Sequence, residues 1–157
     1  MPTLALALAA LLSARATPTP CHRGETAVLV RVSDHALELC QDGRSVARHK
    51  VALGSGGIGK RQQGDGKTPL GLYPLGAPRP SASFGTFVPV GYPTAQQHRL
   101  GFTGNSVGIH GPPRGVGGAL TTTIDWTAGC IAVGTDAEIA AISAWIRDRR
   151  VRTVRIE

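Results

Sequence analysis

Aromatic residues are scarce in this 157-residue chain, which has three Phe, two Trp and two Tyr against 21 glycines. Such a composition disfavours a helical bundle and favours short strands joined by many turns. No block of Lys and Arg is interleaved with aromatic residues, which argues against a nucleic-acid partner. The sequence also lacks internal repeats. Its length predicts one domain with a core large enough to fold alone.

Acidic residues are also few, since 10 Asp and Glu stand against 17 Lys and Arg, and the formal net charge is +7. A surface of this sign suits an anionic partner such as an acidic polymer. The same charge serves solubility in a protein without such a partner. The charge therefore narrows the class of partner without identifying one.

No apolar run is long enough to cross a bilayer as a helix. Leu4–Leu12 is an apolar run of signal-peptide length, and Ala14-Arg15-Ala16 places small residues where a signal peptidase cuts. We predict that residues 1–16 are a signal peptide and that the protein is exported, to the periplasm or cell wall, without a stable membrane anchor. A buried N-terminal helix is the alternative. Residues 17–25 would then be a short N-terminal segment before a domain at 26–157.

Only three cysteines are present, and no two of them have the close spacing of a zinc site, so we predict no metal. An oxidising compartment favours pairing. Cys21 and Cys40 lie near each other in the N-terminal half, whereas Cys130 lies far along the chain. We therefore predict a Cys21–Cys40 disulfide and a free Cys130. The alternative is that all three thiols are free.

Strand patterns dominate the chain, and Asp42-Gly43 is a strong hairpin signal. Residues 76–104 carry many prolines and most of the aromatic residues, and we interpret them as an irregular crossing loop. The strand after this loop ends at His110, and the last strand should lie at a sheet edge. We expect strands at residues 27–32, 36–41, 45–53, 70–75, 106–111 and 151–157.

One helix is clearly indicated near the C-terminus. Thr135 can cap it, and Glu138 three residues later completes a capping box. The helix carries an apolar stripe that we interpret as core packing. The stripe consists of Ile139, Ile142, Trp145 and Ile146. The predicted fold class is therefore mostly β with one substantial C-terminal helix.

Gly54–Lys60 spell G-x-x-x-x-G-K after a predicted strand, which is nearly a phosphate-binding loop. Arg61 follows where a Ser or Thr should hold magnesium. Gly64, Gly66 and Pro69 prevent a helix from beginning there to face the phosphates. We interpret the stretch as a glycine-rich hairpin and expect no nucleotide.

Cys130 and His110 are the candidate chemical pair. A thiol attacks carbonyl groups as the thiolate, and an imidazole can take its proton. Among five histidines, His110 stands out because it ends an apolar strand and precedes Gly-Pro. Gly129 lets a substrate backbone approach and lets successive N–H groups form an oxyanion hole. A buried structural thiol is the alternative, but an unused free thiol is a liability in an oxidising compartment.

Four short motifs in one order resemble the L,D-transpeptidase family with the YkuD-type catalytic domain. "GIHG" is followed, about twenty residues on, by "DWTAGCIAV", which is similar to the family's His-Gly and Ser/Thr-x-Gly-Cys pattern. Upstream, "GDGKTPLGLYPL" resembles its Lys-Thr-Pro-x-Gly segment and "GYPT" its Tyr-Pro segment. The likeness covers residues 26–157.

The resemblance implies a β-sandwich-like fold and a cell-wall substrate. It maps Cys130 as the nucleophile and His110 as the general base, with the carbonyl of Gly111 orienting the imidazole in place of a carboxylate. The N–H groups of Gly129 and Cys130 are the expected oxyanion donors. Thr127 matches the family's Ser/Thr position and should support the site by hydrogen bonding.

Four residues are expected at the substrate side of the site: Thr127, Trp126, Tyr92 and Asp125. Asp125 is the acid nearest to Cys130 in sequence, and it is structural or faces the substrate. The resemblance thus predicts an enzyme that acts on peptidoglycan stem peptides through a thioester and forms cross-links without a cofactor. The alternatives are an L,D-carboxypeptidase or hydrolase of the same bonds, and a non-catalytic wall-binding module.

Overall fold

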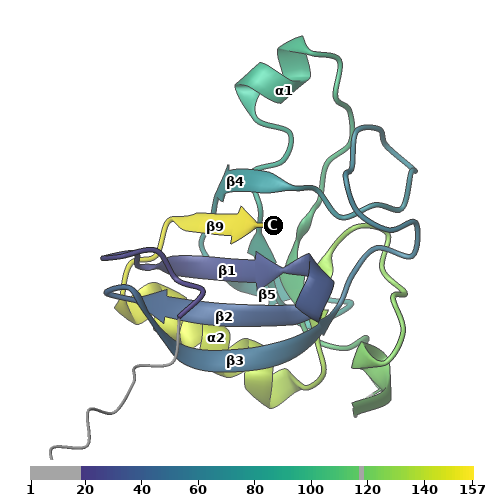
Figure 1. Cartoon of the computed structure of the whole chain (residues 1–157). Helices are drawn as coiled ribbons and strands as arrows, with labels where there is room; N and C mark the ends of the chain where they lie inside the picture. The colour runs from purple at the N-terminus through teal and green to yellow at the C-terminus, as the bar shows by residue number, and fades with distance from the viewer. Residues whose placement is uncertain (1–18, 117–118) are drawn as a thin grey trace, which may run out of the picture.

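The computed structural model describes residues 19–116 and 119–157 (Figure 1). The predicted signal peptide, residues 1–16, lies outside the described residues. No helix in the described part of the chain combines the length and the apolar character needed to span a membrane. The strands are β1 (Ala27–Arg31), β2 (Ala36–Gln41), β3 (Arg44–Ala52), β4 (Gly71–Pro74), β5 (Arg79–Ser81), β6 (Gly85–Pro89), β7 (Gly108–His110), β8 (Ile131–Val133) and β9 (Thr153–Ile156). The helices are α1 (Ala95–Arg99) and α2 (Asp136–Asp148), with 3-10 turns at η1 (Val32–Asp34) and η2 (Ala119–Thr122).

All nine strands belong to one curled sheet with the order β4-β9-β1-β2-β3-β8-β7-β6-β5. β3 forms the corner, because its residues up to Lys50 pair with β2 while Val51 and Ala52 pair with β8. The two halves enclose a common core of aliphatic residues. This confirms the predicted mostly β fold with one main helix.

The β2–β3 hairpin shows why the sequence folds locally as it does. Asp42 and Gly43 both have positive φ, 51° and 80°, which a tight hairpin turn requires. A Cβ at Gly43 would lie 2.7 Å from the Gly24 nitrogen, so glycine is also needed for the N-terminal segment to pass.

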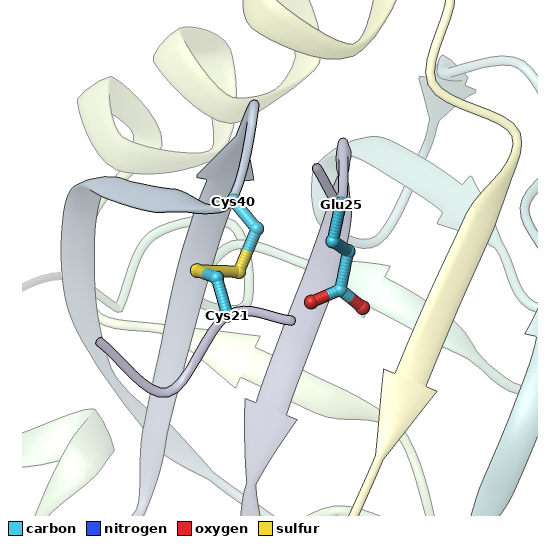
Figure 2. A group of neighbouring side chains, drawn as sticks. All are labelled: Cys21, Glu25 and Cys40. Atoms are coloured by element: carbon cyan, nitrogen blue, oxygen red, sulfur yellow. A yellow bond between two sulfur atoms is a disulfide. The ribbon is translucent and has the colours of Figure 1, made fainter. Parts of the chain in front are cut away.

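The outer face of β1 and β2 is covered by the N-terminal segment. Cys21 and Cys40 form a disulfide with a Cα–Cα distance of 5.6 Å, and Leu29 packs beside it. Glu25 lies close to both sulfur atoms (Figure 2). Because the sulfur atoms are bonded to each other and the carboxylate of Glu25 binds Arg155 at 2.8 Å, this group forms a structural clasp and offers no thiolate to a metal.

α2 crosses behind β2 and β3 (Figure 1) and is joined to both. Trp145 Nε1 donates to Gln41 Oε1 at 3.4 Å, and His49 Nδ1 lies 3.2 Å from Glu138 Oε1. The hydroxyl of Thr135 accepts from the Glu138 nitrogen, as expected of the cap. The carboxylate of Glu138 accepts from that hydroxyl and not from the Thr135 nitrogen, so the predicted capping box is only half formed. The buried face of α2 includes Ile139, Ile142 and Ile146, as the apolar stripe predicts.

Two sequence predictions are wrong. Residues 76–104 hold the β5–β6 hairpin and helix α1, because prolines are tolerated in the edge strand β5 and because Thr94 and Gln97 form a capping box. The C-terminal strand β9 is interior, since it pairs with β1 on one side and β4 on the other. These partners come from distant parts of the chain, which local patterns do not reveal.

Candidate active site

His110 ends β7 and is almost fully buried, with 1% of its surface exposed. Its ring stacks on Phe84 with centroids 3.7 Å apart and 16° between the planes, and Trp126 flanks it at 5.8 Å. Nδ1 lies 2.7 Å from the carbonyl oxygen of Gly111. Because a carbonyl oxygen can only accept, Nδ1 carries the proton and Nε2 has a lone pair. The predicted pairing of His110 with the Gly111 carbonyl is therefore present.

Burial sets the charge of the imidazole. Removal from water disfavours the imidazolium and lowers the pKa of His110, while its hydrogen bond to Gly111 acts in the opposite direction. Burial therefore favours the neutral ring, in which Nε2 can accept a proton.

The first turn of α2 supports this histidine from behind. A Cβ at Gly111 would lie 3.0 Å from Cγ2 of Ile139 and 3.3 Å from Oδ1 of Asp136. The chain after His110 is thus in close contact with the helix, which fixes the carbonyl that orients the ring.

Cys130 immediately precedes β8, which pairs with β7 in parallel, with Ile109 opposite Ile131 and His110 opposite Ala132. Side chains two residues apart in a strand point to the same face. Carried back to Cys130, which directly precedes β8, this rule assigns Cys130 to the face of Ala132, the residue that pairs with His110. The register therefore predicts that the side chains of Cys130 and His110 lie near each other.

The thiol of Cys130 is free and partly buried. Its Sγ donates to the carbonyl oxygen of Ser106 at 3.4 Å. Burial raises the pKa of this thiol, while a hydrogen bond from the backbone of Gly108 and the charge of Lys60 lower it. Burial thus favours the neutral form of both groups, the thiol of Cys130 and the imidazole of His110.

Thr127 holds the loop that carries the nucleophile. It is 3% exposed, and its hydroxyl donates to the Cys130 carbonyl at 2.7 Å and accepts from the Gly129 nitrogen at 3.1 Å. Gly129 has φ of 130°, and a Cβ there would lie 2.6 Å from the Lys67 carbonyl oxygen. The Gly129 N–H is thus hydrogen-bonded to Thr127, which differs from its expected role as a free oxyanion donor.

Trp126, Asp125 and Tyr92 are the other three residues predicted at the substrate side, and each has its own surroundings. Trp126 flanks His110 and donates from Nε1 to the Thr121 carbonyl at 2.8 Å. Asp125 is structural, since its carboxylate accepts from the Leu53 nitrogen at 2.8 Å and lies 3.0 Å from His35 Nε2.

Tyr92 belongs to the core and is 5% exposed. Its hydroxyl donates to the Thr103 carbonyl at 3.1 Å, and its ring lies 6.0 Å below the Lys60 ammonium. Because Tyr92 is buried, it does not offer the surface for substrate contact that we expected, and it supports the loop that contains Lys60 instead.

Two residues near the site, Phe84 and Lys60, were not identified by the sequence analysis. Phe84 lies in the stretch interpreted as a crossing loop, and nothing local indicates that it stacks on His110. Lys60 belongs to the glycine-rich stretch that was interpreted as a plain hairpin. The structure packs this stretch against residues 65–68 and buries Lys60 beside the loop of Cys130. The sequence feature that could have identified Lys60 is its position directly after several glycines, because glycines allow a loop to pack closely around a side chain.

Comparison with known proteins gives a clear result. The sequence model of the YkuD family, the L,D-transpeptidase catalytic domain, matches residues 25–156. No curated protein is significantly similar in sequence, whereas 43 chains of solved structures match significantly.

Three solved structures illustrate the likeness. The helical cell shape determining protein Pgp2 from Campylobacter jejuni is 28% identical, with a TM-score of 0.70 over 83% of this chain and 46% of that one. The L,D-transpeptidase from Xylanimonas cellulosilytica is 19% identical, with a TM-score of 0.53 over 90% and 65%. L,D-transpeptidase 3 from Mycobacterium tuberculosis, in complex with a faropenem-derived adduct, is 12% identical, with a TM-score of 0.52 over 83% and 59%.

The chain spans about half the length of the Campylobacter protein. At 19% and 12% identity, the other two likenesses support the fold alone. The family match covers nearly all of the residues that the structure describes, and it confirms the resemblance found in the four sequence motifs. The chain belongs to the L,D-transpeptidase family with the YkuD-type catalytic domain.

Proposed function

We propose that this protein is a cysteine-dependent L,D-transpeptidase that acts on peptidoglycan stem peptides. The observation that carries the proposal is the register of β7 and β8, in which His110 pairs with Ala132, two residues after Cys130. The Nδ1–H bond to Gly111 supports it, because the bond leaves Nε2 as a base. In this role Cys130 is the nucleophile and His110 the general base.

The reaction starts from the neutral pair. Sγ of Cys130 attacks the carbonyl carbon of the amide between the diamino acid and the terminal D-alanine, and His110 Nε2 takes the thiol proton. The N–H of Cys130 stabilises the oxyanion. When the C–N bond breaks, His110 gives the proton to the leaving amine, D-alanine departs and a thioester remains on Cys130. The amine of a second stem peptide then attacks the thioester, forms the cross-link and returns the thiol.

The surroundings of the substrate are part of the proposal. The net charge of +7 suits a wall polymer that is rich in carboxylates. The Cys21–Cys40 disulfide fits an oxidising compartment, which agrees with export to the periplasm or cell wall.

Product analysis tests this function. The purified protein is incubated with stem tetrapeptides, and cross-linked dimer with released D-alanine is expected by mass spectrometry. Cys130→Ala and His110→Ala should abolish both products, whereas His98→Ala, at an exposed position on α1, should keep them. If tripeptide forms without dimer, the activity is hydrolysis and not transpeptidation. If the tetrapeptide stays unchanged, the protein catalyses neither reaction.

A covalent probe tests the nucleophile separately. L,D-transpeptidase 3 from Mycobacterium tuberculosis was crystallised with a faropenem-derived adduct. Exposure of this protein to a carbapenem should add one adduct by intact mass, and Cys130→Ala should abolish it. An adduct that persists in that variant would contradict the assignment of Cys130.

A further inference from the structure

Lys60 is a buried cation that the proposed reaction does not use. Only 4% of its side chain is exposed, and Nζ donates to Asp65 Oδ1 at 2.8 Å and to the Gln62 carbonyl at 3.1 Å. Taking an ammonium out of water is costly, even when it is paired. An exposed lysine could form the same ion pair within the loop without this desolvation cost. The burial of Lys60 therefore suggests a further role for its charge.

The stem of Lys60 lies between the two backbone segments that surround the nucleophile. Its Cδ is 3.8 Å from the position of a Cβ on Gly129, the residue before Cys130. Its Cε is 3.1 Å from the position of a Cβ on Gly104, two residues before the Ser106 carbonyl that accepts the thiol hydrogen bond. A Cβ at Gly104 would press on the lysine stem, whereas a Cβ at Gly129 would be at ordinary contact distance from it, so the stem packs closely against both segments.

The two charges of the ion pair act on different neighbours. The charge of Lys60 lowers the pKa of the Cys130 thiol, whereas the charge of Asp65 raises the pKa of the Tyr92 phenol. The titratable groups on the segments near the Cys130 loop are Lys60 with its partner Asp65, Tyr92, whose ring centroid lies 6.0 Å from the Lys60 ammonium, and His110 at the end of β7.

Asp65 is fixed by the loop in which it lies. Its carboxylate accepts from the backbone nitrogens of Arg61, Gln62 and Lys67 at 2.9, 3.0 and 3.0 Å. These bonds and the ammonium hold the pKa of Asp65 far below its usual range. The carboxylate is thus ionised at any working pH, and it holds Lys60 in place without rearrangement when charge develops at the sulfur.

We infer that Lys60 is a positioning residue whose ammonium, held by Asp65, stabilises negative charge on Cys130 Sγ as the thiol proton leaves. It supplies an electrostatic contribution that the buried, neutral His110 does not supply before proton transfer. The inference rests on the proposed function in taking Cys130 as the nucleophile, and it deepens the description of that site.

The test is the pH dependence of alkylation of Cys130 by iodoacetamide, followed by intact mass on the disulfide-intact protein. Lys60→Met should shift the rate profile to higher pH and slow alkylation at neutral pH by roughly three- to tenfold, the scale expected when one adjacent charge is lost. Lys60→Arg should restore most of the rate. Lys67→Met, in the same loop and with the same loss of charge, should match the wild type.

Each outcome decides the inference. Coincident profiles for Lys60→Met and the wild type would overturn it, and so would equal slowing in Lys67→Met. Lys60→Gln, whose amide can still donate to Asp65, repeats the measurement if the Met variant unfolds. If both uncharged variants unfold while Lys60→Arg folds, the charge serves the fold and the inference is wrong. Alkylation needs no turnover, so a Lys60 effect in a protein that forms no product would refute the proposed function alone.

Discussion

Replacing Thr127 by valine should separate the hydroxyl from the shape of this side chain. Valine keeps the volume and the β-branch but removes the group that joins the Cys130 carbonyl to the Gly129 nitrogen. Both backbone groups would then lose their partner at a position where the side chain is 3% exposed. Each buried polar group left without a partner costs about 1–3 kcal/mol, so we expect Thr127→Val to lower the free energy of unfolding by about 2–6 kcal/mol.

Urea denaturation of the disulfide-intact protein measures this loss, and an unchanged m-value would show that the same surface is exposed on unfolding. Thr127→Ser is the matched control, because it keeps the hydroxyl and loses one methyl group, which costs about 1 kcal/mol. The rate of Cys130 alkylation should change in the valine variant and stay near the wild-type value in the serine variant. Equal unfolding free energies for the two variants would refute the argument that the hydroxyl organises the loop.

Two further predictions concern the clasp and the base. Replacing Cys21 and Cys40 by serine opens a loop with a sequence separation of 19, and urea denaturation should show a loss of about 3 kcal/mol; a loss under about 1 kcal/mol would contradict the loop-closure argument. Burial lowers the pKa of His110, so between the lowered and the ordinary histidine pKa the folded protein binds fewer protons than the unfolded chain. The contribution of His110 to stability is therefore complete above the ordinary histidine pKa and should decline as pH falls below it. Between pH 7.5 and 5.5 the melting temperature of the wild type should fall more than that of His110→Gln, and kcat/KM should fall only as pH drops through the lowered pKa.

Local chemistry explains why part of the fold could be predicted. The Asp42-Gly43 turn fixes the β2–β3 hairpin, and Thr135 fixes the start of α2, because both signals act within a few residues. The position of β9 between β1 and β4 depends on one partner from the N-terminal part and one from the middle of the chain, so its alternating pattern could not distinguish an edge from an interior strand.

In the candidate site, too, some residues could be predicted from local sequence, whereas others depend on the fold. His110 and Cys130 could be named from their motifs, since thiol and imidazole chemistry limits the choice of residues. The stacking of Phe84 on His110 and the burial of Lys60 depend on which loops meet in space. The occupation of the Gly129 N–H by Thr127 depends on the geometry of one turn, which the residue types alone did not reveal.

The sheet corner at the end of β3 has a consequence for how activity arises during folding. The Leu53 nitrogen donates to Asp125 and its carbonyl accepts from the Thr127 nitrogen, while the Gly54 nitrogen donates to the Thr68 hydroxyl. The loop that contains Thr68 and the loop that contains Asp125 and Thr127 are therefore both hydrogen-bonded to Leu53 and Gly54. Contacts between residues so far apart in sequence form late in folding. In a refolding experiment, alkylation of the Cys130 thiol should therefore reach its native rate only when the complete sheet has formed.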